Sequence, residues 1–165
     1  MGLDMYLRTN SKKLCEEMND ADDAFESILI PRGIAIQWRK ANAIHKWFVD
    51  TVQGGNDDCG LYEVEVSELA MLHDTCKEVI ESARLDEEHD GQLLVDSETA
   101  ARLLPTQSGF FFGGTEYGLD YLLDLKFTVE KLGRLLDSLE PSGPFNVVHK
   151  DEPDWFVRFY YTSSW

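Results

Sequence analysis

Positive charge is scarce in this sequence. Its 165 residues include 31 Asp and Glu but only 15 Lys and Arg, which gives a formal net charge of −16 at pH 7. Nucleic-acid binding relies on basic residues that neutralise phosphates, and anionic membranes attract basic segments. The composition therefore argues against direct nucleic-acid binding and against a membrane partner. It predicts either a solvated acidic surface or a surface that repels or imitates nucleic acid.

Cysteines and long apolar runs are also few. Cys15, Cys59 and Cys76 form no CxxC pair, and an odd number of unpaired cysteines is typical of a reducing compartment. No apolar run approaches the roughly 20 residues that a membrane-spanning helix needs. Asp4 interrupts the short apolar start, so no signal peptide is predicted. We expect a soluble protein of the cytoplasm.

The sequence contains none of the common catalytic or metal-binding motifs. There is no GxSxG elbow, no GxGxxG and no GxxxxGK[ST] loop. Asp57 and Asp58 lack the spacing of a calcium loop. Four histidines show neither HxxxH pairing nor cysteines at zinc spacing: His45, His73, His89 and His149. We therefore predict no catalytic residue, no metal and no cofactor. An enzyme acting on a nucleotide stays an alternative, with His45 as its general acid or base.

Hydrophobic periodicity indicates a single globular domain over residues 1–165. Alternating apolar residues predict strands at 3–8, 34–37 and 61–66, and two strands around a turn at 150–154. Apolar residues spaced by three and four predict helices from Ser11 to Pro31, over 38–52, from Ser67, from Ser97 to Pro105 and over 119–139. Residues 85–91 are expected to form an exposed loop. The fold class is α+β: a small mixed or antiparallel sheet, made of the N-terminal strand plus a C-terminal hairpin, packed by four to five helices.

The predicted helix 38–52 is unusual in so acidic a chain. No Asp or Glu occurs between Ser27 and Val49. Arg, Lys, His, Asn and Trp side chains together suit a planar ligand that carries phosphate. Arg39 and Lys40 would neutralise the phosphate, Asn42 and His45 would donate hydrogen bonds, and Trp38 would stack on a base. The alternative is that these charges form an ordinary solvated face, with His45 in the core.

Residues 105–115 carry no charge and are rich in Gly and Phe. Glycines permit close approach of the backbone to a ligand, and the start of the following helix offers free N–H groups to an anion. Gln107 and Ser108 add side-chain donors, and Phe111 or Tyr117 could stack on a base. This segment is predicted to form one wall of the ligand pocket. The alternative interpretation is a tight turn beside a buried aromatic strand.

Carboxylates are concentrated on the first predicted helix and in the DEEHD run at 86–90. Such a surface could cover the basic, nucleic-acid-binding face of another protein, which makes an acidic protein–protein inhibitor the second hypothesis. The residues of this surface on the helix are Glu16, Glu17, Asp20, Asp22, Asp23 and Glu26.

Several segments resemble an uncharacterised family of small proteins encoded by phages and prophages. They are MGLDMYL at 1–7, WRKANAIHKWFV at 38–49, DDCG at 57–60, LLPTQSGFFFGGTEY at 103–117 and YYTSSW at 160–165. The resemblance implies a phage accessory protein in the bacterial cytoplasm, where proteins of this size often counteract host defence. Our first hypothesis is a non-enzymatic protein that sequesters a small anionic, nucleotide-like ligand. The second is an anti-CRISPR-like inhibitor of a bacterial defence protein, and a homodimer is open for both.

Overall fold

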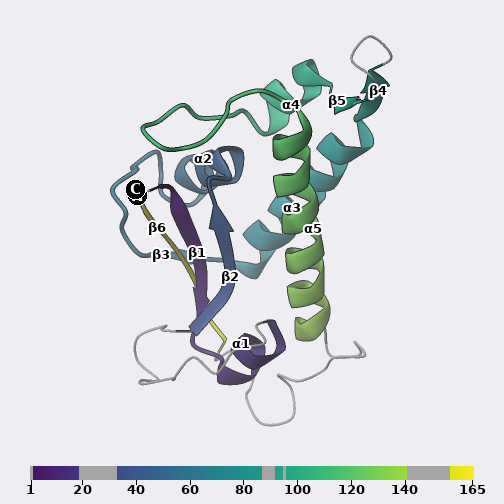
Figure 1. Cartoon of the computed structure of the whole chain (residues 1–165). Helices are drawn as coiled ribbons and strands as arrows, with labels where there is room; N and C mark the ends of the chain where they lie inside the picture. Colours follow the sequence, from purple (N-terminus) through teal and green to yellow (C-terminus); the bar gives the residue numbers. More distant parts are fainter. Residues whose placement is uncertain (1, 19–32, 87–91, 95, 141–156) are drawn as a thin grey trace.

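The main sheet has four antiparallel strands. The computed structural model describes residues 2–18, 33–86, 92–94, 96–140 and 157–165. Within these, the strand order is β2–β1–β6–β3, with β1 (Asp4–Thr9) and β6 (Phe159–Ser164) at the centre (Figure 1). The edge strands are β2 (Gly33–Arg39) and the short β3 (Tyr62–Val64). The N-terminal and C-terminal strands therefore pair directly.

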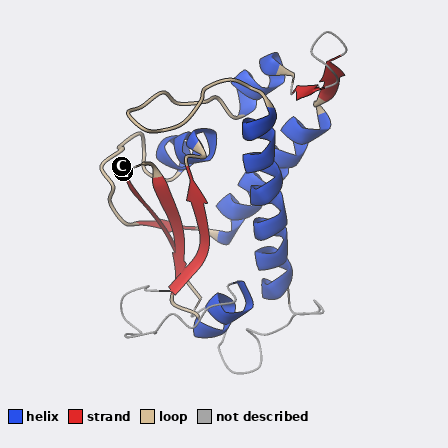
Figure 2. Cartoon of the chain, viewed as in Figure 1, coloured by secondary structure: helices blue, strands red, loops and turns tan. Residues whose placement is uncertain are grey.

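Helices pack around this sheet and make the protein α+β, as predicted (Figure 2). The long helices α3 and α5 lie side by side, and α2 packs at the end of the sheet where β1 begins. A small second sheet pairs β4 with β5. The bounds are α1 Lys12–Met18, α2 Asn42–Thr51, α3 Val66–Glu81, β4 Arg84–Asp86, β5 Gln92–Leu94, α4 Ser97–Leu103 and α5 Leu119–Leu139.

The core joins the sheet to the helices. Along β1, Met5, Leu7 and Thr9 are buried while the residues between them are half-buried, which is the alternation of a strand with one covered face. Trp38 of β2 is buried, and its indole N–H donates to the hydroxyl of Thr128 on α5 at 2.9 Å. This bond lets a buried indole satisfy its donor while its ring fills the core.

The C-terminal strand confirms one half of the predicted hairpin. β6 runs antiparallel to β1, with Asp4 opposite Ser164, and Phe159 and Tyr161 point into the core. The first strand of that hairpin and the turn at 150–154 lie outside the described residues. The pairing places the chain end at Trp165 beside the start of β1, next to α2.

The prediction of a helix over 38–52 is wrong for its first residues. Trp38 and Arg39 end strand β2, and Lys40 turns the chain with a φ of 60° before α2 begins at Asn42. The backbone N–H of Lys40 donates to Leu3 at 2.8 Å, which closes the pairing of β2 with β1. Local periodicity is compatible with a helix here, but pairing with the neighbouring strand decides the conformation.

Three other boundaries also differ from the predictions. Glu65, and not Ser67, caps α3: its side chain accepts from the backbone of Glu68, while the Glu68 side chain accepts from the N–H of Glu65 at 2.8 Å. This reciprocal pair starts the helix earlier and shortens the strand predicted at 61–66. The predicted loop at 85–91 begins inside strand β4. Residues 105–118 form a loop with no strand, so a buried aromatic strand there is wrong.

Candidate functional site

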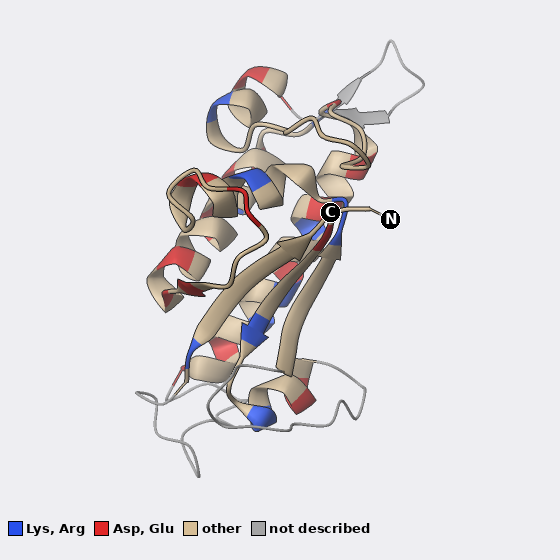
Figure 3. Ribbon diagram, turned by 90° about the vertical axis from the view of Figure 1, so that its left-hand side faces the viewer, with Lys and Arg blue, Asp and Glu red and all other residues tan. Residues whose placement is uncertain are grey.

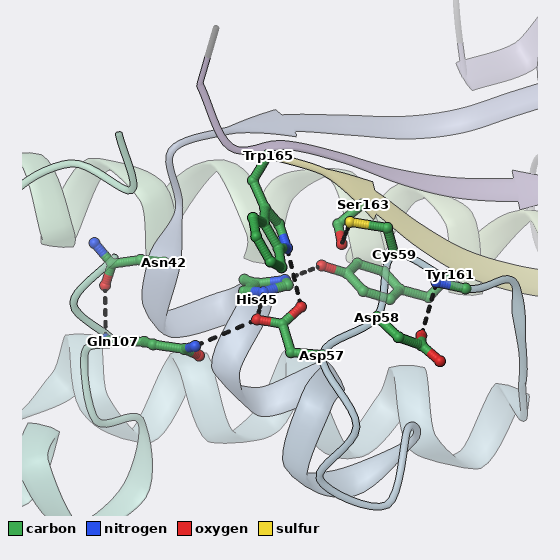
Figure 4. Close-up of polar contacts among 10 residues, drawn as sticks. Asn42, His45, Asp57, Asp58, Cys59, Gln107, Tyr161, Ser163 and Trp165 are labelled. Carbon is green, nitrogen blue, oxygen red and sulfur yellow. Dashed lines mark hydrogen bonds and ion pairs between the residues drawn. The ribbon is translucent and has the colours of Figure 1, made fainter. Parts of the chain in front are cut away.

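His45 lies at the centre of a buried polar network near the end of the sheet. Its side chain is 0% exposed, on α2, and both ring nitrogens have partners (Figure 4). Nδ1 lies 2.7 Å from the hydroxyl of Tyr161 on β6, and Nε2 lies 3.0 Å from Oδ2 of Asp57. A buried imidazole with both nitrogens bonded is held in one orientation.

The chemistry of the two partners determines the direction of these hydrogen bonds. Burial raises the pKa of the Tyr161 phenol well above its ordinary value, with further contributions from Asp57 and Cys59, so the phenol keeps its proton. The Asp57 carboxylate can only accept, so Nε2 of His45 donates to it. In neutral His45, Nδ1 then accepts from Tyr161. Tyr161 therefore donates to His45, and His45 donates to Asp57.

Asp57 links this network to two distant parts of the chain. Oδ1 accepts from the indole N–H of Trp165 at 3.1 Å, and Oδ2 also accepts from the side-chain amide of Gln107 at 3.4 Å. The carboxylate therefore fixes the C-terminal residue and the loop 105–118 at the same place. Asp57, Tyr161 and Trp165 lie in segments already noted in the sequence, but nothing in the sequence assigned them as partners of His45, because only the fold brings them together.

Asn42 holds the loop 105–118 against α2. Its amide nitrogen donates to the carbonyls of Phe112 at 3.2 Å and Gly114 at 2.7 Å, and its oxygen accepts from the backbone N–H of Gln107 at 3.1 Å. The side chain is 5% exposed. Asn42 thus serves as a backbone-like partner for three otherwise unpaired loop groups. Its hydrogen-bonding capacity is directed at the protein itself.

The loop exposes two phenylalanines and buries the third, Phe112. Phe112 is buried edge-on against the His45 ring, with 5.4 Å between ring centroids, and also contacts Trp165. Phe110 is 84% exposed, and Phe111 is half-exposed with a φ of 69°. The three consecutive phenylalanines therefore differ in role: Phe112 packs the loop against His45 and Trp165, and Phe110 and Phe111 lie on its surface.

A cavity of about 240 Å³ lies beside the first turn of α2. Its walls are the start of α2, the start of α5 and part of the loop 105–118. The sequence predicted a pocket between the segment 38–52 and the uncharged loop; this cavity borders both, with the start of α5 as its third wall. The polar and charged residues lining it are Lys40, Asn42, Thr106, Glu116, Asp120, Tyr121 and Asp124.

The cavity has both positive and negative contributions to its electrostatics. Within the described part of the chain, no side chain caps the first turn of α2 or of α5. The first N–H groups of a helix have no intrahelical acceptor and carry a partial positive charge. Lys40 adds a full positive charge, while Asp120 and Asp124 add carboxylates. Burial, with a smaller contribution from the neighbouring Asp120, raises the pKa of Asp124 from 3.8 to about 6.

The raised pKa of Asp124 predicts a distinct pH dependence of stability. Between pH 3.8 and about 6 the folded protein keeps this proton and the unfolded chain loses it. The contribution of Asp124 to the free energy of unfolding therefore falls as pH rises through this window and is constant above it. We expect Asp124→Asn to remove this slope. The measurement is urea unfolding of both proteins from pH 4 to 8, and a constant difference between them across that range would contradict the assignment.

The other predicted ligand residues lie in different environments. Trp38 is in the core and His45 is fully buried, so neither is open to a ligand in this conformation. Arg39 is exposed and forms an ion pair with Asp4 at 3.6 Å, outside the cavity lining. Ser108 and Phe111 are exposed on the loop, whereas Gln107 belongs to the Asp57 network. Tyr117 packs edge-on against Tyr121, and its hydroxyl accepts from the backbone of Thr106 at 3.4 Å.

The predicted acidic surface is described only in part. Glu16 pairs with Lys12 at 3.6 Å, and Glu17 pairs with Arg134 of α5 at 3.1 Å. Asp20, Asp22, Asp23 and Glu26 lie outside the described residues, as do residues 87–90 of the DEEHD run. Over the residues that are described, acidic positions are spread across the helices and the loop after α2 (Figure 3).

Metal-binding clusters and membrane-spanning helices are both absent from the described residues. Among the described residues, no group of three or more His, Cys, Asp and Glu side chains is arranged to hold a metal ion. No helix in the same part of the chain is long and apolar enough to cross a membrane.

Comparisons of the chain with protein-family models, with curated proteins and with solved structures found no significant match. The sequence segments at 2–7, 38–49, 57–60, 103–117 and 160–165 lie close together in the fold. Leu3, from the first of them, bonds to Phe111 and Lys40, and the others meet at the network of His45, Asp57, Gln107 and Tyr161.

Proposed function

We propose that the protein binds a small anionic, nucleotide-like ligand, without catalysis, in the cavity between α2, α5 and the loop 105–118. One observation carries the proposal: the starts of two helices without side-chain caps, together with Lys40, line the same cavity. Helix N-termini bind anions because their free N–H groups and the helix dipole act together. A phosphate between α2 and Lys40 would receive both.

The carboxylates of the cavity indicate what else the ligand carries. Asp120 and Asp124 can accept hydrogen bonds from N–H groups, as a nucleobase offers on its pairing edge. A ligand with phosphate at one end and N–H donors at the other would meet complementary groups at both ends of the cavity. The volume of about 240 Å³ is smaller than the roughly 300–1,000 Å³ of typical ligand pockets. A mononucleotide, or one part of a larger nucleotide, is the size class that we propose.

The biological setting that we propose is counter-defence by a phage. The resemblance to phage-encoded proteins supports it, as does the absence of an obvious catalytic motif from the sequence. A protein that holds a nucleotide signal without cleaving it would lower the concentration of that signal in the bacterial cytoplasm.

Lys40→Ala is the direct test of the cavity. A charge-assisted hydrogen bond to an anion contributes roughly 1.5–3 kcal/mol, so we expect affinity to fall by about one to two orders of magnitude. Lys40→Arg keeps the charge and should keep most of the affinity. The measurement is isothermal titration calorimetry of the three proteins against mono-, di- and cyclic nucleotides, after a thermal-shift screen identifies the best of them.

Arg39→Ala is the matched control, because it removes the same charge from the adjacent residue. Arg39 pairs with Asp4 and does not line the cavity, so its loss should change affinity by less than about threefold, through long-range attraction alone. Equal losses for Arg39→Ala and Lys40→Ala would place the ligand outside the cavity. A wild-type protein that binds none of the nucleotides would refute the proposal.

The observed contacts give less support to the two alternative functions, a nucleotide-processing enzyme and an acidic protein–protein inhibitor. A general acid or base must reach its substrate, whereas His45 is fully buried with both nitrogens bonded to the protein. An acidic inhibitor needs a concentrated negative face, whereas Glu16 and Glu17 each pair with a cation. The net charge of −16 keeps the second alternative open, and its signature would be partner binding that weakens steeply with salt.

A further inference from the structure

Helix α5 carries an exposed apolar stripe on its outer face. Leu119, Leu123 and Phe127 follow one another at intervals of four residues, and their exposures are 52%, 52% and 37%. Residues at this spacing lie above one another on one side of a helix. The opposite side of α5 is buried in the core through residues such as Leu125 and Leu132. Contiguous exposed apolar side chains of this size commonly mark an interaction site.

The charges beside this stripe have opposite signs at its two ends. Asp120 lies near the N-terminal end and Lys131 near the C-terminal end. They are about three turns apart, which places them on the same flank of the helix. An acidic partner would be repelled by one end of this face and a basic partner by the other. A second copy of α5 in the antiparallel direction would meet the opposite charge at both ends.

We propose that α5 is a self-association face, on which two copies of the chain pair their α5 helices antiparallel across a two-fold axis. Asp120 of each copy faces Lys131 of the other, and Leu123 packs against Phe127 of the other. The Asp120–Lys131 pairing has its midpoint between Leu125 and Lys126, and the Leu123–Phe127 pairing has its midpoint at Leu125. The two midpoints differ by about 0.75 Å along the helix, so one axis near Leu125 accommodates both pairings. The interface is isologous, as in most soluble dimers. This inference does not require the ligand proposed above, although Leu119 and Asp120 belong both to this face and to the cavity lining.

Two features limit the strength of this association. The two copies of Lys126 approach each other near the axis, although Glu130 lies one turn later on the same helix and can offset that charge. Each chain also carries a net charge of −16, so the two copies repel each other over long range. A single helix face buries less than the roughly 800 Å² per partner of a standard interface, so we expect a dimer with a Kd in the micromolar range.

The test is sedimentation velocity of the full chain, without added nucleotide, over a range of protein concentrations. Wild type should shift from monomer to dimer as concentration rises, and Leu123→Glu should stay monomeric throughout. Leu61→Glu is the matched control. Leu61 is 48% exposed just before β3, across the molecule from α5, so this variant should dimerise like wild type (Figure 1). Circular dichroism of each variant checks that it is folded.

Charge reversal tests the antiparallel register. Asp120→Lys and Lys131→Asp should each raise the dimer Kd by about tenfold or more, because each places two like-charged pairs across the axis. The double variant restores opposite charges and should return to within about threefold of wild type. A monomeric wild type, or equal behaviour of the two Leu→Glu variants, would overturn the self-association face. A double variant as weak as the single ones would overturn the antiparallel pairing.

Discussion

Replacing His45 by Ala should lower the free energy of unfolding by about 3–5 kcal/mol, because it leaves a cavity and removes a hydrogen-bond partner from buried Tyr161 and from partly buried Asp57. Tyr161 loses the acceptor of its hydroxyl, and Asp57 loses one of its donors. The Phe112 ring also loses the surface against which it packs. Urea unfolding at neutral pH, followed by circular dichroism, measures the loss. A cost below about 1 kcal/mol would show that the network contributes little to stability.

Two companion variants separate the polar network from the packing around it. Tyr161→Phe removes only the hydroxyl and keeps the ring that stacks on Phe48 at 4.0 Å, so it should cost about 1–2 kcal/mol. Lys46→Ala, on the same helix as His45, removes an exposed ion pair with Asp50 and should change stability by less than about 0.5 kcal/mol. The order His45, Tyr161, Lys46 in decreasing cost is the expected result.

Local sequence patterns predicted the elements well where one face of an element meets the core. The alternation in β1 and the three-and-four spacing in α5 each reflect burial on one side, and both elements were found at the expected residues. The pattern failed around Trp38, where a strand and a helix follow each other almost directly. Both conformations bury Trp38, so periodicity alone could not separate them, and the pairing of β2 with β1 decided.

The site was only partly predictable, for a different reason. Asn42, His45 and Gln107 stood out as hydrogen-bond donors for a ligand, at the border of an apolar helix face and in an uncharged loop. Their partners come from segments far away in the chain, and no local signal identifies Asp57 or Trp165 as those partners. Asn42 and His45 were predicted to donate hydrogen bonds to a ligand. In the structure Asn42 bonds to the loop carbonyls, and His45 bonds to Tyr161 and Asp57.

Buried polar side chains such as Asn42 thus hold the walls of the cavity in position, and their hydrogen bonds are not available to a ligand. Asn42 joins the two parts of the site, since it borders the cavity and also fixes the loop that forms one of its walls. Any ligand in the cavity would therefore depend on Asn42 for the shape of its binding site, through loop position. This separates residues that hold the site, such as Asn42, from residues that would touch a ligand, such as Lys40.

Asn42→Asp should be at least as damaging as Asn42→Ala, at a cost of about 3 kcal/mol or more, although Asp is nearly the same size as Asn. The amide nitrogen of Asn42 donates to the carbonyls of Phe112 and Gly114. A carboxylate in its place would set a negative oxygen against two carbonyl oxygens in a buried position. Asn42→Ala only removes the three hydrogen bonds and leaves the loop groups unpaired.

Hydrogen–deuterium exchange shows whether this cost falls on the loop 105–118. Both Asn42 variants should lose protection at the backbone N–H of Gln107, which donates to Oδ1 of Asn42, while the strand N–H groups of β1 keep theirs. Thr106→Ser is a suitable control within the loop, because it keeps the hydroxyl that donates to the carbonyl of Thr115 at 3.0 Å. A stable Asn42→Asp protein with a protected loop would contradict the role of Asn42, because the loop would then hold its position without the amide.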